Sequence, residues 1–195
     1  MKEYLASSRW IDPDDAGVQS LVAERGWRTL GEVDAARAAF HFVRDEVHHS
    51  WDIKSHRVTR TASEALVHRE GLCFSKAMLL AALFRALGLP AGLAYQRLTF
   101  GDTPDTGFSL HGFTTVYLAS AARWVRLDAR GNKAGVDAQF SLDGERLAFP
   151  VRPQLGERDF PWNLAEPHPA VAAALDAHDD LHVLIERLPD APDAG

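Results

Sequence analysis

Apolar residues recur at helical spacing in the first half of the chain and at strand spacing in the second half. In the first half, the clearest series of apolar residues three or four positions apart is Val33, Ala36, Phe40, Val43 and Val47. This series predicts an amphipathic helix over about residues 30–47, and Thr29 and Glu32 have the spacing of a capping box at its start. A shorter helix is expected over about residues 14–24. The polar stretch 48–60 has no period, which predicts a loop or a short strand.

A nearly continuous apolar stretch, CFSKAMLLAALFRALGLP over residues 73–90, is the strongest helical segment. Its apolar side chains occupy almost every face, which is the pattern of a helix buried on all sides. Before it, Thr61 and Glu64 again have capping-box spacing, which predicts a short helix that Gly71 ends. Cys73 is therefore expected in the first turn of the buried helix.

Beyond this helix the hydrophobic pattern changes to period two. Segments rich in β-branched and aromatic residues predict strands at residues 92–99, 110–118 and 124–129. Their short spacing favours an antiparallel meander. Residues 132–162 carry scattered Gly, Pro and apolar positions, which predicts a long wrapped loop with some strand, and Pro169 is placed to begin closing helices. Helices followed by strands, with one buried helix against the sheet, predict an α+β fold.

The composition is typical of a soluble globular protein, and 195 residues suit a single domain over residues 1–195. We expect its core over about residues 30–132, with residues 133–195 wrapped around that core. A net charge of −6, with no segment that concentrates Lys or Arg, argues against a nucleic-acid binder. No membrane span or signal peptide is expected, because the longest apolar run has eight residues. The single cysteine fits a reducing compartment, so we expect a cytoplasmic protein, whose oligomeric state the sequence leaves open.

That single cysteine also lies where a nucleophile is expected. The positive end of a helix dipole lowers the pKa of a thiol, and Cys73 is predicted at such an end, with Gly71 leaving room for a substrate carbonyl. A thiol nucleophile also needs a base, and the base needs a group that orients it. His111 lies near the start of one predicted strand and Asp128 at the end of the next. If these strands pair, both side chains fall at the same end of a hairpin. The backbone N–H groups of the first helical turn, that of Cys73 among them, are the expected oxyanion donors.

Each of these residues also has a simpler explanation. A lone cysteine is most often a small buried apolar residue, and any one of nine histidines is more often a surface or hydrogen-bonded residue than a base. A metal site is another alternative, because His48, His49, Asp52 and His56 lie close together in the sequence. Adjacent histidines point in different directions, however, and no HExxH or paired CxxC motif is present. A solvated polar loop is therefore favoured, and no metal ligand is assigned.

The longer motifs around the cysteine resemble those of the transglutaminase-like superfamily. The similarity runs through TASEALVHREGLCFSKAMLLAALFRALGLPAGLAYQ, LHGFTTVYL and RWVRLDARGN, from Thr61 to Asn132, in the family order Cys, His, Asp. Two segments, DARGNKAGVDAQF over residues 128–140 and LAFP over residues 147–150, resemble a bacterial subgroup of transglutaminase-like proteins and cysteine proteases. The resemblance implies a papain-like α+β core, with the cysteine-bearing helix packed on an antiparallel sheet and further helices at the N-terminus. It also implies Cys73 as nucleophile, His111 as base and Asp128 as orienting carboxylate.

The reaction implied by this resemblance is attack on an amide or thioester carbonyl to give a thioester intermediate. We therefore expect a thiol-dependent hydrolase of an amide or isopeptide bond that needs no cofactor and acts on a peptide, a protein or a small-molecule amide. Two alternatives stay open. One is an amine acyltransferase of transglutaminase or N-acetyltransferase type, and the other is a non-enzymatic binding module whose groove the loop over residues 101–107 blocks.

Several positions depart from the family pattern or extend it. Gly112 follows His111, where many members carry a small residue and then Trp, so an aromatic wall beside the substrate is less clearly implied. No acidic loop of the EF-hand type is present, so calcium dependence is not expected. Trp51 is a candidate indole donor to the oxyanion, although core packing is favoured for it. Gln96, on an expected buried strand, is interpreted either as a substrate contact or as a solvent-facing side chain.

Overall fold

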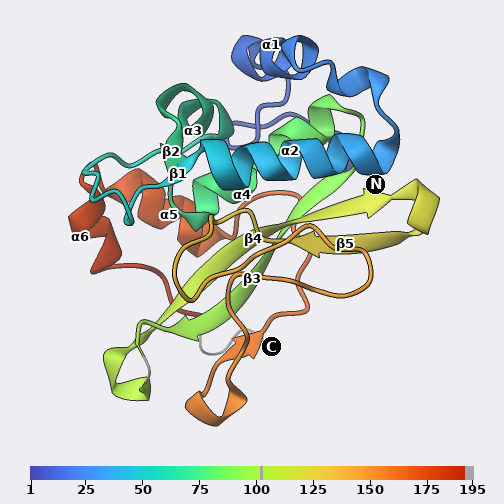
Figure 1. Ribbon diagram of the computed structural model, residues 1–195. Helices are drawn as coiled ribbons and strands as arrows, with labels where there is room; N and C mark the ends of the chain where they lie inside the picture. The colour runs from blue at the N-terminus through green and yellow to red at the C-terminus, as the bar shows by residue number, and fades with distance from the viewer. Residues whose placement is uncertain (102, 192–195) are drawn as a thin grey trace.

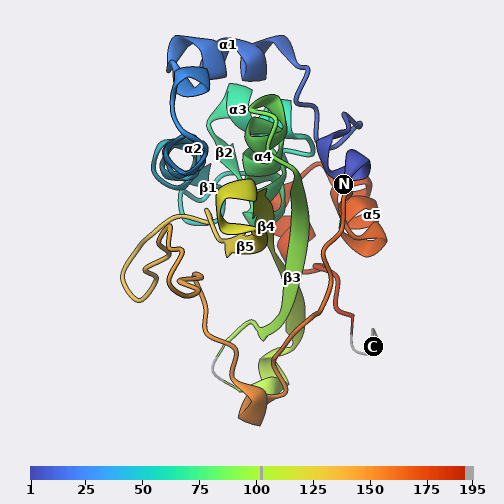
Figure 2. The same cartoon turned by 90° about the vertical axis from the view of Figure 1, so that its right-hand side faces the viewer.

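Helices and an antiparallel sheet form two packed layers in the computed structural model, which describes residues 1–101 and 103–191 (Figure 1). The turned view shows the cysteine-bearing helix α4 (Cys73–Ala86) at the centre, between α2 (Glu32–Glu46) and α5 (Pro169–Ala177) (Figure 2). The α+β class and the packing of a buried helix on an antiparallel sheet, both predicted from the sequence, are confirmed.

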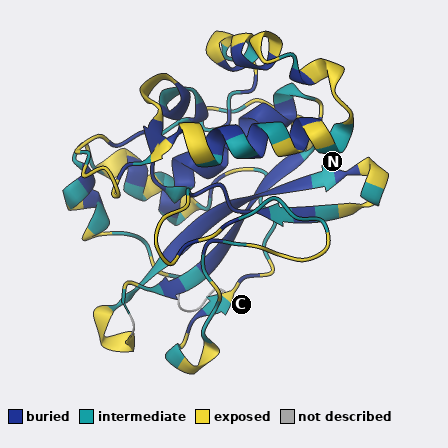
Figure 3. Cartoon of the chain, viewed as in Figure 1, coloured by how far each residue is buried: buried dark blue, intermediate teal, exposed yellow. Residues whose placement is uncertain are grey.

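The remaining helices also lie close to their predicted positions. They are α1 (Ala16–Glu24), α3 (Ala62–His68) and α6 (Leu181–Ile185), with short 3-10 helices at Lys2–Leu5, Trp27–Thr29, Pro104–Thr106, Ala119–Ala121 and Pro153–Leu155. Every residue of α4 from Phe74 to Arg85 is buried, as its all-round apolar pattern predicts. Colouring by burial shows this helix and the sheet beneath it as a continuous buried region (Figure 3). Among the described residues, no helix has both the length and the apolar character that a membrane crossing requires.

The start of α2 differs from the predicted capping box. Gly31 is the N-cap residue and makes no side-chain cap, while the hydroxyl of Thr29 donates to the carbonyl of Gly26. The carboxylate of Glu32 instead accepts hydrogen bonds from the backbone N–H groups of Ala119 (2.7 Å) and Ser120 (2.9 Å). Glu32 therefore ties the first turn of α2 to a strand connection far along the chain, and a local capping signal cannot anticipate that contact.

The second capping pair is confirmed at Thr61, whose side chain accepts from the backbone N–H of Glu64 at 3.1 Å. The predicted end of this helix is wrong, because α3 ends at Arg69 in the left-handed conformation (φ 53°), before Gly71. Gly71 belongs instead to a two-residue strand, β2 (Glu70–Gly71), which pairs in parallel with β1 (His48–His49). This short parallel sheet fills the stretch that the sequence left as a loop or a short strand.

The larger sheet has four antiparallel strands in the order β5, β4, β3, β6. Their bounds are β3 Ala91–Thr99, β4 Phe108–Leu118, β5 Arg123–Leu127 and β6 Arg158–Asp159. The first three are the predicted meander, and β6 pairs at the edge of β3. Thr114 of β4 lies opposite Leu127 of β5, so the residues just before Thr114 and just after Leu127 meet at one end of the hairpin.

Candidate active site

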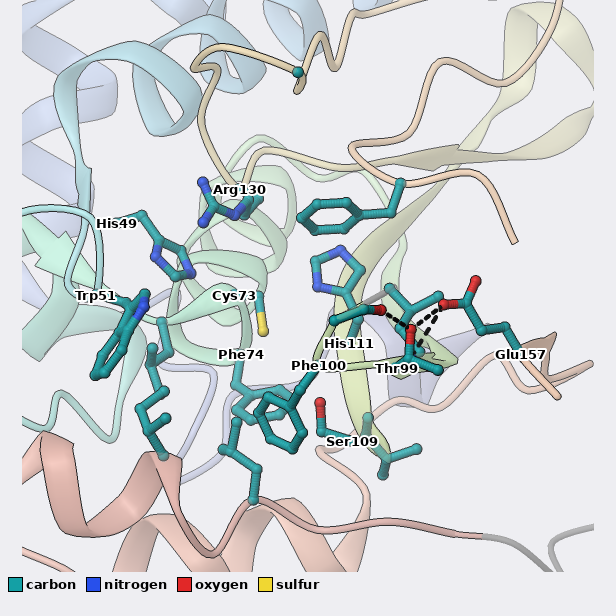
Figure 4. A pocket seen from close by; sticks show the side chains of 18 of the residues that line it. His49, Trp51, Cys73, Phe74, Thr99, Phe100, Ser109, His111, Arg130 and Glu157 are labelled. Carbon is teal, nitrogen blue, oxygen red and sulfur yellow. Dashed lines mark hydrogen bonds between the residues drawn. The ribbon is translucent and has the colours of Figure 1, made fainter. Parts of the chain in front are cut away.

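A cavity of about 680 Å³ opens at the N-terminus of α4, between the helices and the β3–β4 hairpin (Figure 4). Cys73 lines this cavity together with His111. Much of the remaining wall is apolar and includes Trp51, Leu72, Phe74, Phe100, Leu110, Phe149, Ile185 and Leu188. The described part of the loop over residues 101–107 contributes only Gly101 to the wall. The cavity therefore reaches the one cysteine of the chain.

The first turn of α4 presents Cys73 with its backbone donors uncapped. The N-cap residue Leu72 is extended (φ −68°, ψ 170°), and no side chain caps the helix. A Cβ added at Gly71 would lie 2.5 Å from the hydroxyl of Ser75 and 3.2 Å from that of Thr59. Glycine is thus required there for close approach of strand and helix within the protein, which corrects the expectation that Gly71 makes room for substrate. The uncapped N–H groups at this helix end can bind an anionic oxygen.

His111 and Asp128 form a buried hydrogen-bonded pair. The distance from His111 Nε2 to the nearer carboxylate oxygen, Oδ2, of Asp128 is 2.7 Å. Asp128 follows the last residue of β5, and the hairpin register places it beside His111 on β4. The same carboxylate accepts backbone N–H donors from Arg130 (3.1 Å) and Ala148 (3.0 Å). With Nε2 engaged in this way, Nδ1 is the ring nitrogen left to serve a reacting group.

The electrostatics of the pair favour an imidazolium beside a carboxylate. Burial disfavours the charged form of His111, but the Asp128 carboxylate, with a smaller contribution from the neighbouring Cys73, outweighs it and raises the pKa of His111 to about 10. Burial likewise disfavours ionised Asp128, yet the attraction and hydrogen bond of His111, with the two backbone donors, lower the pKa of its carboxyl group. His111 is therefore protonated, and Asp128 ionised, at neutral pH.

Phe149 and Phe74 shape the surroundings of the pair. The ring of Phe149 packs edge to face on His111, with centroids 5.2 Å apart. On the neighbouring position of β4, a Cβ at Gly112 would lie 3.0 Å from the ring of Phe74 and 3.2 Å from that of Tyr95. Glycine follows His111 because these two rings occupy the space that a side chain there would take. Aromatic rings are thus present around His111, with Phe149 coming from outside the segments that resemble the family and Phe74 from the position directly after Cys73.

The two weaker sequence candidates occupy different places. Trp51 lines the cavity and is 44% exposed, with its ring 5.3 Å from that of His182, so the prediction that it packs in the core is wrong. It lies in the turn after β1, which carries it to the surface. Gln96 is 2% exposed and does not face solvent. Its Cα lies opposite that of His111 in the β3–β4 register, and it lines a second cavity whose wall also includes Phe149.

The four residues of the alternative metal site go to separate partners. His48 is exposed, whereas its neighbour His49 lines the cavity. Asp52 is bound by two cations, and His56 contacts Asp180 at 2.8 Å. Within residues 1–101 and 103–191, no group of three His, Cys, Asp or Glu side chains is placed to hold a metal ion. The structure therefore does not support this cluster as a metal site.

A cluster of charged side chains lies beside the cavity, and the sequence pattern did not predict it. Arg130 binds both carboxylate oxygens of Asp52, at 2.5 and 3.0 Å, and Lys133 contacts the same carboxylate at 2.7 Å. Burial opposes ionisation of Asp52, but these two cations lower the pKa of its carboxyl group far below the usual value. The pairing fixes the turn that carries Trp51 against the segment after Asp128. Asp52 lies 78 and 81 positions from its two partners in the chain, so spacing could not predict the cluster.

Lys76 lies one turn after Cys73 in α4 and is almost completely buried. Its ammonium group donates to the carbonyl of Val47. Burial, followed by repulsion from Arg130, lowers the pKa of Lys76 to about 7, although the Asp128 carboxylate favours its charge. The folded protein therefore holds a lysine whose charge is poorly solvated.

We predict that Lys76→Met raises the free energy of unfolding at pH 7 by about 2 kcal/mol. A lysine pKa lowered to about 7 means that burying the charge costs the folded protein about 5 kcal/mol, which the variant regains. The variant also leaves the Val47 carbonyl without its donor, which costs about 1–3 kcal/mol. Between pH 7 and about 10 the unfolded lysine binds more protons than the folded one, so the wild-type protein gains stability and the advantage of the variant shrinks. Urea unfolding at pH 7 and 10 measures both effects, with the exposed Lys2→Met as control. A destabilised variant at pH 7 would contradict the prediction.

Comparison with known proteins supports the fold. The sequence model of a protein family, described as the transglutaminase-like superfamily, matches residues 22–129. A solved structure from Cytophaga hutchinsonii, described as a candidate cysteine protease, is 24% identical with a TM-score of 0.50, over 65% of this chain and 40% of that one. A second, described as a TGase, is 18% identical with a TM-score of 0.48, over 72% of this chain and 37% of that one. The chain thus spans about two fifths of the length of these structures. No curated protein sequence matches it.

Proposed function

The chain belongs to the transglutaminase-like superfamily, and on that premise we propose that it is a thiol-dependent hydrolase of an amide or isopeptide bond. Cys73 is the nucleophile, His111 the acid and base, and Asp128 the group that orients His111. The observation that carries the proposal is the buried 2.7 Å contact between His111 and Asp128 at a cavity that Cys73 also lines. A base held by a carboxylate beside a thiol is the arrangement that thiol acyl transfer needs.

Acylation begins with attack of the Cys73 sulfur on the substrate carbonyl carbon, which moves one electron pair onto the carbonyl oxygen. The backbone N–H of Cys73, at the uncapped start of α4, donates to that oxygen. Collapse of the tetrahedral intermediate breaks the carbon–nitrogen bond. His111 gives its proton to the departing amine, and the acyl group remains on Cys73 as a thioester.

Deacylation uses the same residues in the opposite direction. His111, now neutral, accepts a proton from water as the water oxygen attacks the thioester carbonyl. The carbon–sulfur bond then breaks, releasing a carboxylic acid and restoring the thiolate beside a protonated His111. An amine in place of water would give a new amide, so product analysis with and without an added primary amine separates hydrolysis from acyl transfer.

The proposal predicts an unusual pH dependence for alkylation of Cys73. An imidazolium at His111 favours a thiolate beside it, so the rate with iodoacetamide should stay within about tenfold of its plateau down to about pH 6. In His111→Ala the rate at pH 6 should fall by at least about tenfold and rise only near pH 8.5, as for an ordinary thiol. Cys73 is the single cysteine of the chain, so intact-mass spectrometry reports this one site.

A matched control for this measurement is His68→Ala, which removes an exposed histidine at the end of α3. It should leave the alkylation profile of the wild-type protein unchanged. If the wild-type rate rises only near pH 8.5 and His111→Ala has the same profile, Cys73 is an ordinary thiol and the hydrolase proposal fails. The same fold would then be interpreted as a binding module.

A further inference from the structure

His49 is the cavity residue whose position the proposed mechanism leaves unexplained. The short parallel sheet pairs it with Gly71, and the N–H of Ser50 donates to the carbonyl of Gly71 at 3.0 Å. Because Gly71 is two residues before Cys73, this pairing sets the imidazole beside the first turn of α4. The ring is turned toward the side of the cavity on which Cys73 lies (Figure 4).

The ring of His49 is buried without a hydrogen-bond partner that would account for it. Its side chain is 10% exposed, and Nδ1 makes no hydrogen bond with any described residue. The nearest acidic atom, Oδ2 of Asp52, is 3.9 Å from Nδ1, beyond hydrogen-bond distance, and that carboxylate is already held by Arg130 and Lys133. An unpaired polar group in such a site costs stability, so a purely structural role would be better filled by an apolar residue.

The charges around His49 keep its ring neutral. Burial is the main cause that lowers the pKa of His49 well below its usual value, and repulsion from Arg130 is the next. The Asp52 carboxylate raises this pKa, whereas Lys76 and His111 lower it further. A neutral ring offers an N–H donor without a positive charge. A cationic donor would also stabilise the thiolate of the resting enzyme, whereas a neutral one acts mainly where negative charge develops on the substrate.

We propose that Nε2–H of His49 and the backbone N–H of Cys73 together bind the oxyanion of the tetrahedral intermediate, an assignment that rests on the proposed hydrolase function. The uncapped start of α4 supplies one donor. The second is Nε2–H of His49, whose other ring nitrogen, Nδ1, is buried and has no hydrogen-bond partner among the described residues. His49 neither gains nor loses a proton in the cycle. Trp51, the other side-chain donor considered for this role, is 44% exposed and contacts His182.

The test compares His49→Leu, which removes the donor, with His49→Gln, which restores an N–H at similar reach. The probe is p-nitrophenyl acetate, whose reaction with Cys73 passes through an oxyanion, and the acetylated protein is identified by intact mass. Loss of one oxyanion donor costs about 100–1,000-fold, so acylation of His49→Leu should fall by about 100-fold and that of His49→Gln by less than about tenfold. Alkylation by iodoacetamide forms no oxyanion and should change by less than about threefold in both variants.

The exposed neighbour gives a matched control, since His48→Leu changes the same strand without touching the cavity and should acylate at the wild-type rate. A wild-type acylation rate in His49→Leu overturns the assignment, and so does an equal loss of acylation and alkylation, which would mean a general disturbance of the site. Loss in Trp51→Phe but not in His49→Leu also overturns it, in favour of the indole. If the wild-type protein acylates no faster than Cys73→Ala, the hydrolase proposal itself fails.

Discussion

Cys73→Ala is expected to reduce acyl transfer to the detection limit, because alanine has no atom that can form the thioester. Removing the nucleophile of a comparable catalytic group costs about 10⁶-fold in kcat. The fold should survive, since the Cys73 side chain is only partly buried at the edge of a cavity, and loss of a small group at such a site costs about 1 kcal/mol or less. The variant should therefore fold and melt close to the wild-type protein.

Release of p-nitroaniline from peptide anilides and of p-nitrophenolate from p-nitrophenyl acetate measures this loss, with thermal unfolding as the check on folding. Cys73→Ser is the matched control, because it keeps the size and polarity of the side chain while replacing sulfur with a much weaker nucleophile. It should be nearly as inactive as the alanine variant. Turnover of Cys73→Ala at the wild-type rate would exclude the proposed mechanism.

Asp128→Asn is expected to lower kcat by about 10²–10⁴-fold, close to the loss when an orienting aspartate is replaced in a serine protease. The physical reason is the set of donors around the carboxylate: one oxygen accepts from His111 and Ala148, and the other from Arg130. An asparagine has only one oxygen. In either orientation its NH₂ group faces another donor, so the site loses a hydrogen bond and the preferred orientation of the imidazole.

Two measurements separate this effect from simple unfolding. Without the carboxylate the pKa of His111 should fall from about 10 toward its usual value, so the rate of Cys73 alkylation at pH 6 should fall as well. The carboxyl pKa of Asp128 is lowered in the folded protein, so ionised Asp128 contributes to stability above about pH 4, and this contribution is lost as pH falls through the folded pKa. The free energy of unfolding of the variant, measured as a function of pH, should lack this loss. Asp143→Asn, at an exposed position in the segment after β5, is the control and should retain activity. Full activity in Asp128→Asn would remove Asp128 from the mechanism.

Local patterns predicted the elements that carry the candidate site. The all-round apolar stretch identified α4 and placed Cys73 in its first turn, because a helix buried on every side leaves a signal in each of its residues. Period-two alternation identified the strands on which His111 lies and after which Asp128 follows. It left open the register of the hairpin, which is settled by the pairing of Thr114 with Leu127.

The residues that sequence reasoning missed act through contacts between distant segments. His49 was considered only as part of a metal cluster, since nothing in the order of residues shows that β1 would pair with β2 beside the cysteine. Phe149 reaches His111 from an irregular segment without periodicity. Likewise, Glu32 was assigned to a local cap but binds a turn 87 and 88 positions away.

The sequence by itself determined the α+β class, the buried helix with Cys73 at its start, and the order of residues that resembles the transglutaminase-like superfamily. Each of these depends on neighbours within a few positions, where backbone geometry alone decides which side chains share a face. Only the tertiary structure decided that His111 meets Asp128, that Arg130 pairs with Asp52, and that Nδ1 of His49 is buried without a partner among the described residues. Those contacts depend on which faces are buried together, because burial removes the water that would otherwise satisfy each polar group and so makes its partner a property of the whole fold.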